Sequence, residues 1–497
     1  MTQDADRIPV IVGVGQINDR PHDPFEGLDS LGLMAAAARA ADADAGGGWL
    51  EWLDSIGVVS QISFPALGDV SRPLAQMLGA RPRLCVQTPY PSGASPVRLL
   101  NEAANAIARG ELETALIAGG EALRTAAQRA AASGGASADE ATRRASTRST
   151  PDYRQRYGLV APVDVYPLYE NAMRAAGAQT LAEAQSESAE MWARMSEVAA
   201  QNEAAWLRTP VSAAQILDAS AANRPIAFPY TKLMVANSSV NQGAAFIVTS
   251  LAAARRRGIS EERLVYVGYG AAADEPSNIL KRDRFDRSAS MAVSLLRTLQ
   301  LNALTIDDID HAELYSCFPC VPKLARRVIG WPADRPVTVF GGLTFGGGPI
   351  GNYMSHAVAS MVERLRGGGG TGLLFANGGF ATQNHSIVVS RDPERAMRDA
   401  KAFDCQAEAD QARGPAPAID EAYEGPAEIE TYTLFYTRDG APRAGTVVGR
   451  SPAGARFLAK VRGDDAEAIA FLTDGRAEPV GASGAAVREG DEIIWRM

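Results

Sequence analysis

Two stretches of this sequence repeat one order of apolar and polar positions. In residues 84–123, a short strand leads through the turn Tyr90-Pro91-Ser92-Gly93 into a predicted helix over residues 94–109. Arg109-Gly110 ends this helix with a cation and a glycine, as helix C-termini favour. The next segment, residues 114–120, is apolar throughout, which is typical of a strand covered on both faces. The apolar positions of the helix fall on one stripe, formed by Val97, Leu100, Ala103, Ala104 and Ile107.

The second copy follows the same order downstream. A helix-like stretch opens at Pro349-Ile350-Gly351, ends at Arg366-Gly367 and is followed by an apolar segment over residues 371–379. The offset from the first copy is 257 residues, both between the two arginines and between the two apolar segments. Two strand–turn–helix–strand units in one register predict duplicated α/β halves, although two parallel-sheet units also resemble each other without duplication.

The remaining periodicity completes two predicted halves, residues 1–123 with 241–260 and residues 261–390. Further strands are expected near residues 8–15, 56–62, 244–250, 264–270, 309–315 and 386–390, and further helices near 30–42, 73–79, 288–299 and 323–329. Between the halves, residues 124–240 form a long excursion, and such excursions are more often functional than idle. Its aromatic stripes, which include Tyr166, Tyr169, Trp192 and Trp206, are expected to pack in the core.

The chain changes character after residue 390. Residues 391–426 are acidic and rich in Ala, Gln and Pro, which is typical of a linker. From residue 427 to 497 the pattern turns to period-2 strands, expected at 428–436, 444–450, 455–461, 478–480 and 492–495 with a short helix at 465–472. This predicts a small antiparallel β-barrel of the OB type, which is too small for independent stability and is therefore expected to dock on the main body.

Composition narrows the class of protein. The 497 residues are 46% hydrophobic and 22% charged, with a net charge of −9, which argues against a nucleic-acid surface. No apolar run reaches the roughly 18 residues of a membrane span, and the acidic start enters a strand directly, unlike a signal peptide. Four cysteines in so long a chain suit a reducing compartment, so we expect a cytoplasmic protein that binds no membrane.

Two short motifs are weak signals. Gly13-x-Gly15 lacks the third glycine and the helix start of a nucleotide loop. Cys317-Phe-Pro-Cys320 has CxxC spacing, but no two further metal ligands lie nearby in sequence, and thioredoxin-type redox use needs its own fold. We therefore expect these cysteines to be structural or to line a site, and we expect no metal.

In order and spacing, these motifs resemble the thiolase superfamily. The resemblance covers about residues 5–390 and rests on the unit 84–123 with Gly119-Gly120-Glu121, on Tyr315-Ser-Cys-Phe, on the glycine-rich run that ends at Gly348-Pro349, and on Asn377-Gly-Gly. It is closest to the sterol-carrier-protein-type thiolases, in particular to the thiolase-like protein type 1 group, whose members carry an extra C-terminal β-barrel. The resemblance implies a thiolase fold of five layers, αβαβα, followed by that barrel.

Thiolases make or break a carbon–carbon bond in acyl-CoA substrates, but their catalytic residues are not carried over. Tyr90 matches the nucleophilic cysteine (Pro91 if the register slips by one), and Tyr315 matches the Asn or His of the NEAF/HDCF motif. Gly348 matches the histidine of the GHP motif, and Asn377 matches the acid/base cysteine. Thioester attack needs a thiolate, and Claisen chemistry needs a base. Because these four residues supply neither, ordinary thiolase activity is not expected.

Other residues are candidates for altered chemistry. Tyr90 and Tyr315 are expected either to face each other as general acid and base or to line the pocket. Ser92 is a hydroxyl nucleophile or a helix cap, and His356 and His385 are replacement bases or structural histidines. His356 follows Asn352 by four residues on the same helix face. The excursion is where the family binds the nucleotide of coenzyme A, which makes phosphate ligands of Arg143, Arg144, Arg148 and Arg224, although a solvated face is the default for such charges.

Three functions follow from this pattern. The first is an acyl-CoA-binding acyltransferase-superfamily member without the standard Cys/His/Cys machinery, with a coenzyme A thioester as ligand and no permanently bound cofactor. The second is an aldolase-type carbon–carbon lyase that uses tyrosines on a 3-hydroxyacyl-CoA, since the thiolase-like steroid aldolases use tyrosines and a separate OB-fold partner. The third is a non-catalytic acyl-CoA-binding or partner protein. The sequence leaves a monomer and a homodimer open.

Overall fold

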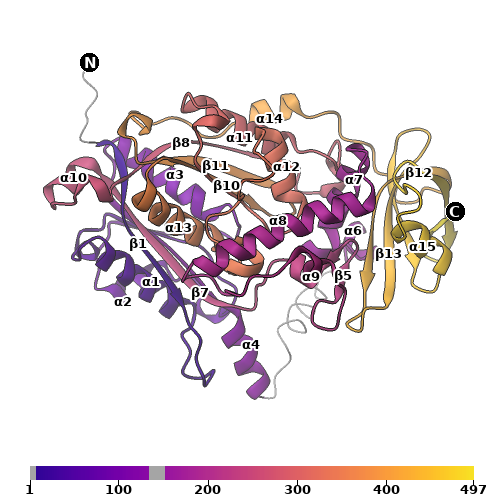
Figure 1. Cartoon of the computed structure of the whole chain (residues 1–497), viewed down its shortest axis with the longest axis horizontal. Coiled ribbons are helices and arrows are strands. Elements are labelled where there is room, and N and C mark those ends of the chain that lie inside the picture. The colour runs from indigo at the N-terminus through magenta and orange to yellow at the C-terminus, as the bar shows by residue number, and fades with distance from the viewer. Residues whose placement is uncertain (1–6, 134–150) are drawn as a thin grey trace.

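The computed structural model describes residues 7–133 and 151–497 (Figure 1). Its main body is built on a nine-stranded mixed sheet whose two halves meet where β1 pairs briefly with β8 at Val10 and Ile11. In spatial order the strands are β3 (Leu84–Gln87), β2 (Ser55–Val58), β4 (Thr114–Ala122), β7 (Asn241–Ser250), β1 (Pro9–Asn18), β8 (Val265–Asp274), β11 (Gln383–Ser390), β10 (Thr371–Gly378) and β9 (His311–Leu314).

Helices lie on both faces of each half-sheet. α1 (Ser30–Asp44) covers β1, β4 and β7 from outside, and α11 (Ala289–Leu301) covers β8 and β11. Two central helices, α3 (Ser95–Ala108) and α13 (Tyr353–Gly368), lie between the halves, because each contacts strands of both (Figure 1). The result is the expected stack of five layers, αβαβα.

The duplication is visible in the topology. β2 and β9 begin 256 residues apart, and β4 and β10 begin 257 residues apart. β7 corresponds to β11 in the same arrangement, since each lies antiparallel between the last parallel strand and the first strand of its half. Among the described residues, no strand of the second half corresponds to β3, and the backbone N–H of Leu314 instead donates to the carbonyl of Val337 in an irregular segment.

The buried pattern follows the sequence closely. Every residue of β4 and of β7 is buried, as the uninterrupted apolar runs predict.

The other α-helices are α2 (Ser71–Leu78), α4 (Leu123–Ala132), α6 (Tyr153–Arg156), α7 (Pro162–Ala176), α8 (Leu181–Gln201), α9 (Ala213–Leu217), α10 (Leu251–Arg256), α12 (Cys320–Ile329), α14 (Gln406–Ala412) and α15 (Ala466–Thr473). None of the described helices is long and apolar enough to cross a membrane.

The C-terminal residues close a five-stranded barrel, as predicted. Its strands are β12 (Gly425–Tyr436), β13 (Pro442–Arg450), β14 (Arg456–Arg462), β16 (Glu492–Arg496) and β15 (Ser483–Glu489), which returns to pair with β12. The expected strand at residues 478–480 is wrong: the chain there is irregular, and the strand lies at β15. A hairpin from the excursion, β5 (Pro225–Ala227) and β6 (Tyr230–Thr231), joins β12 at its free edge.

The barrel docks on the main body through buried polar contacts, which confirms that expectation. Asn171 of α7 donates through Nδ2 to the carbonyl of Tyr432 at 3.0 Å, and Thr431 Oγ1 donates to the carbonyl of Leu168 at 2.6 Å. Both barrel residues belong to β12, so α7 lies directly against this strand. The barrel and the main body are therefore joined along α7.

Candidate functional site

The turn before α3 forms a hydrogen-bonded group with the start of β11. Ser92 Oγ donates to Gln383 Oε1 at 2.6 Å, and Gln383 Nε2 donates to the Tyr90 hydroxyl at 2.6 Å. The backbone N–H of Ala94 donates to Ser92 Oγ at 3.2 Å, so Ser92 also satisfies one N–H at the start of the helix. One glutamine thus orients both hydroxyls at the mouth of α3, where the helix dipole favours negative charge.

These side chains open on a cavity of about 520 Å³. Its wall combines apolar groups, among them Val86, Leu99 and Phe403, with the polar group around Gln383. Arg98 also lines it and forms an ion pair with Glu102 at 2.8 Å. A cavity of this size, lined by apolar groups and by oriented polar groups, is typical of a small-molecule site.

Tyr315 lies on the inner side of the same turn. A methyl group on Gly93 would lie 2.2 Å from both the Tyr315 hydroxyl and the Asn377 carbonyl, so the two halves touch at this glycine. The Tyr315 ring packs edge-on against Tyr353, with ring centroids 5.7 Å apart, and burial raises the pKa of its phenol well above the usual range. Tyr90 is half exposed and lines the cavity, whereas Tyr315 is buried and does not line it.

The residues at the two remaining thiolase positions form hydrogen bonds within the fold. The backbone N–H of Gly348 donates to the carbonyl of Asn237 at 2.8 Å, and Asn377 Nδ2 donates to Asn384 Oδ1 at 2.9 Å. Tyr166 of α7 reaches this region, accepting from the N–H of Ala381 at 2.9 Å and donating to the Gly379 carbonyl at 3.2 Å. Neither glycine nor an amide can transfer a proton near neutral pH.

Both candidate histidines are buried. Asn101 Nδ2 donates to His385 Nε2 at 2.9 Å, and the His385 ring stacks on Phe403 at the cavity wall. His356 lies elsewhere, on α13, where its Nδ1 donates to Gln16 Oε1 at 2.9 Å. Burial lowers the pKa of each imidazole to about 3. Each is therefore neutral at pH 7 and a weak base, and only His385 lies at the cavity.

The cysteines of the CxxC motif are also buried. Cys317 lies beside Tyr166, and burial raises the pKa of its thiol to about 12. Cys320 opens α12, and burial raises the pKa of its thiol well above the usual value. Thiols of this kind are not activated nucleophiles. The described residues contain no group of three or more His, Cys, Asp or Glu side chains that could hold a metal ion.

A buried carboxyl lies behind Tyr353. Glu313 is fully buried and accepts from the Tyr353 hydroxyl at 2.7 Å, from Thr338 Oγ1 at 2.8 Å and from the N–H of Val339 at 3.0 Å. Burial outweighs these donors and raises the pKa of Glu313 from 4.5 to about 7. The carboxyl thus titrates in the neutral range in the folded protein.

This shift predicts a pH dependence of stability. Because the folded pKa is raised, the stabilisation is fully present below pH 4.5 and is lost as the pH rises towards 7, on the order of 3 kcal/mol in total. The variant Glu313→Gln should lose this dependence. We expect urea unfolding of the wild type and the variant between pH 4.5 and 8 to show a steeper decline in the wild type. Parallel profiles would contradict the raised pKa.

Of the arginines expected to bind phosphate, the structure describes Arg224, and Arg224 does not line the cavity. Arg224 donates through Nη1 to the carbonyl of Pro225 at 3.2 Å, beside the barrel hairpin. Arg143, Arg144 and Arg148 lie outside the described residues. The cation that does line the cavity is Arg98, which the sequence pattern did not single out.

Two residues that contact the predicted positions were missed. Gln383 connects Tyr90 and Ser92, and Tyr166 connects Asn377 to the excursion, at a sequence separation of 211 residues. The expectation that Tyr166 packs in the core is correct for its ring, which stacks on Phe318 at a centroid distance of 4.4 Å. A strand register that pairs Gly378 with Gln383 could have placed the glutamine at the site.

Comparison with solved structures defines the class of protein. The main body superposes on thiolases, such as human mitochondrial 3-ketoacyl-CoA thiolase in complex with CoA, with a TM-score of 0.59 at 13% identity over 77% of this chain and 98% of that one. The Ltp2-ChsH2(DUF35) aldolase gives a TM-score of 0.58 at 18% identity over 78% and 99%. These likenesses show a thiolase fold. No curated protein matches the chain.

Two findings then narrow the class to a family. A family model for the thiolase-like protein type 1 additional C-terminal domain matches residues 404–491. A monomeric SCP2-thiolase-like protein type 1 from Mycobacterium smegmatis is 31% identical over 99% of both chains, with a TM-score of 0.82. The chain therefore belongs to the SCP2-thiolase-like proteins of type 1.

Proposed function

We propose that this protein binds an acyl thioester of the coenzyme A type in the cavity at the mouth of α3 and performs no thiolysis. The observation that carries the proposal is the group formed by Ser92, Gln383 and Tyr90 at the start of the helix. Two oriented hydroxyls at the start of the helix, where the helix dipole favours negative charge, suit a polar carbonyl head, and the apolar groups of the wall suit an acyl chain.

The absence of thiolysis follows from protonation states. Attack on a thioester needs a thiolate or an activated hydroxyl, and the α-proton needs a base. Cys317 is a buried thiol with a pKa of about 12, and His385 is a buried imidazole with a pKa of about 3. Ser92 donates its proton to an amide oxygen, which cannot accept it fully.

Binding is tested by isothermal titration with CoA, acetyl-CoA and decanoyl-CoA. We expect decanoyl-CoA to bind most tightly, and Gln383→Leu to weaken it about tenfold, because both hydroxyls lose their orienting partner, a loss of about 1.4 kcal/mol. Gln76→Leu, on the exposed face of α2, is the matched control and should bind like the wild type. Absence of binding by all three thioesters, or equal binding by Gln383→Leu, would refute the proposal.

Thiolysis is tested separately with acetoacetyl-CoA and a longer 3-ketoacyl-CoA. Turnover should stay well below about 1 s⁻¹, the low end of common enzyme rates, with release of acetyl-CoA as the readout. A catalytically active thiolase, assayed in parallel, verifies the substrates. A rate above that limit would show that an activated nucleophile exists and that the protonation argument is wrong.

One observation favours a second candidate, an aldolase-type carbon–carbon lyase. The Tyr315 hydroxyl has no hydrogen-bond partner among the described residues and lies against Gly93, so a displacement of this turn would bring it from outside the cavity wall to a substrate oxygen. A protein of similar fold, the Ltp2-ChsH2(DUF35) aldolase, is an aldolase by name. Product analysis with a 3-hydroxyacyl-CoA distinguishes the candidates: a cleaved aldehyde or ketone supports the lyase, and unchanged substrate refutes it.

A further inference from the structure

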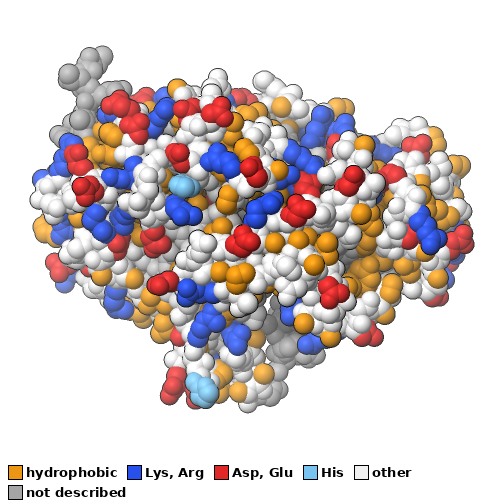
Figure 2. Space-filling model, viewed as in Figure 1, with side chains coloured by type: hydrophobic (Ala, Val, Ile, Leu, Met, Phe, Trp, Pro, Cys, Tyr) orange, Lys and Arg blue, Asp and Glu red, His pale blue; other side chains and the backbone are white. Residues whose placement is uncertain are grey.

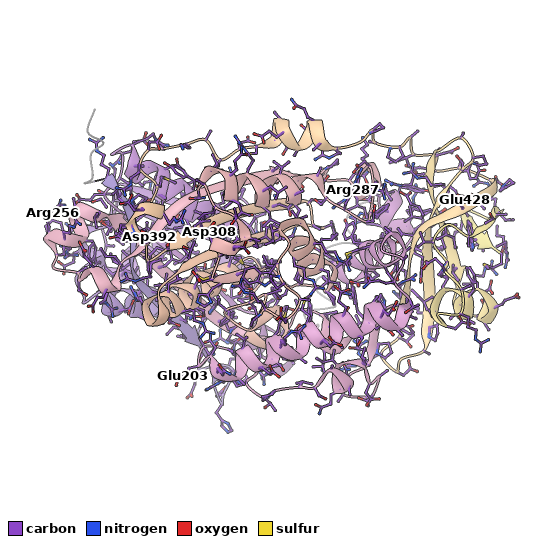
Figure 3. The ribbon with its side chains drawn as sticks, turned by 45° about the horizontal axis from the view of Figure 1, so that its top comes forward. Glu203, Arg256, Arg287, Asp308, Asp392 and Glu428 are labelled. Carbon is purple, nitrogen blue, oxygen red and sulfur yellow. The ribbon has the colours of Figure 1, made fainter. Side chains whose placement is uncertain are left out.

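A second cavity lies away from α3, where the end of β1 meets the C-terminal ends of α8 and α13. Its volume is about 1050 Å³, at the upper end for small-molecule pockets. Glu203, which follows α8, lies at its rim (Figure 3). None of the residues assigned to the acyl-thioester cavity lines it, so the two are separate.

Polar side chains that hydrogen-bond to one another form the floor of this cavity. Ser360 is 3% exposed, and its Oγ accepts from Gln16 Nε2 at 3.2 Å and from Asn202 Nδ2 at 3.0 Å. The remaining oxygens of the two amides are also used: Gln16 Oε1 accepts from His356, and Asn202 Oδ1 accepts from the N–H of Ala204 at 2.9 Å. The amides therefore have one fixed orientation.

The Ser360 hydroxyl hydrogen has no acceptor in the described part of the chain. Its Oγ accepts both of these hydrogen bonds, and within the described residues it finds no carbonyl partner in α13 of the kind that Ser188 finds in α8. A buried donor that lines a cavity without a partner is costly unless a ligand or water accepts from it. This donor points to a ligand with an oxygen acceptor.

The rim of the cavity adds both hydrogen-bond donors and hydrogen-bond acceptors. The carboxylates of Glu203 and Glu363 only accept, whereas the guanidinium of Arg364 only donates. His311 also lines the rim, and burial together with Arg364 lowers the pKa of its imidazole, so it is neutral at pH 7. Two carboxylates against one guanidinium leave no excess of positive charge for a phosphate. Figure 2 likewise shows both signs interspersed over this face.

The lining also carries apolar side chains, with Val198, Ala204 and Val339 as its aliphatic members. Donors and acceptors both line the cavity beside them, and the one common group that donates and accepts at the same atom is the hydroxyl. We propose that this cavity binds a neutral, polyhydroxylated molecule, a sugar or polyol, whose hydroxyls bridge the buried Ser360 and the carboxylates of the rim.

The test uses three probes on the full chain: sucrose, inorganic phosphate and decanoate, each followed by saturation-transfer NMR and titration. We expect sucrose to bind with a Kd between about 0.1 and 10 mM. We expect that neither phosphate nor decanoate displaces bound sucrose. Ser360→Ala should weaken sucrose about fivefold, because the free donor is removed. Glu203→Gln, an exposed change that leaves the floor intact, should weaken it about threefold.

Gln300→Ala, an exposed amide on α11, is the control and should bind sucrose like the wild type. Absence of sucrose binding at about 50 mM, displacement of sucrose by phosphate, or unchanged binding in both cavity variants would overturn the proposal. Thioester binding at α3 is unaffected by any of these outcomes, so the two sites are judged independently.

Discussion

Replacing Arg456 by methionine is expected to cost the protein about 3–5 kcal/mol of unfolding free energy, measured by urea denaturation. The Arg456 side chain is fully buried at the start of β14. It is held in a bidentate pair by Glu430 of β12 and donates through Nη1 to the carbonyls of Leu280 and Arg282, at 2.6 and 2.7 Å. One guanidinium therefore joins two barrel strands to the main body.

The loss of unfolding free energy is large because Arg456→Met leaves buried polar groups without a hydrogen-bond donor. Methionine has similar bulk but leaves the buried part of Glu430 and two carbonyls without their donor, and each unpaired buried group keeps its full desolvation cost. The neighbouring Arg450 supplies a matched control, since it binds the same carboxylate at 2.8 Å but is partly exposed. Arg450→Met should cost less than about 1 kcal/mol.

The barrel and the body need not unfold in one step, so limited proteolysis supplements denaturation. Cleavage near residues 413–424 should rise in Arg456→Met and not in Arg450→Met, because only the first releases the barrel from the body. Equal losses in both variants would mean that the carboxylate pair matters and the two carbonyls do not. In that case the barrel is attached mainly by the contacts of β12 with α7.

A comparison of the barrel with the main body shows which secondary-structure elements the sequence pattern predicts and which it does not. β4 and α3 were predictable because each buries one continuous apolar pattern, in a run or on a stripe. β15 was missed because its sequence, SGAAVRE, has one β-branched residue and no clear alternation. Its strand state depends on pairing with β12 and β16, which are distant in the chain.

The site shows the same division. The motif positions Tyr90, Tyr315, Gly348 and Asn377 came from the resemblance to the thiolase superfamily, and Gly93 lies against two of them, Tyr315 and Asn377. The partners that decide their chemistry were not local: Gln383 lies 291 residues from Ser92, and Tyr166 lies 211 residues from Asn377. Protonation states were equally hidden, because the burial of His385 and Cys317 depends on all surrounding layers.

Gly93→Ala is expected to be the most damaging single change at the site, with a loss of more than about 4 kcal/mol or of soluble protein. The added methyl group would lie 2.2 Å from the carbonyl oxygen of Asn377 and 2.2 Å from the Tyr315 hydroxyl. The tyrosine could move, but the carbonyl belongs to β10, which is paired on both sides by β11 and β9. The clash therefore separates the two halves or displaces α3.

A second glycine and a double variant separate this clash from a general effect of alanine. Gly367→Ala, near the end of α13, meets no atom within 4 Å and should stabilise the protein by about 0.5–1 kcal/mol, as alanine does in helices. Adding Tyr315→Phe to Gly93→Ala removes the contact with the hydroxyl but not with the backbone. We expect it to recover less than half of the lost thermal stability. Since the turn of Ser92 and Tyr90 depends on this close approach, a fully stable Gly93→Ala protein would mean that the two halves do not meet at α3.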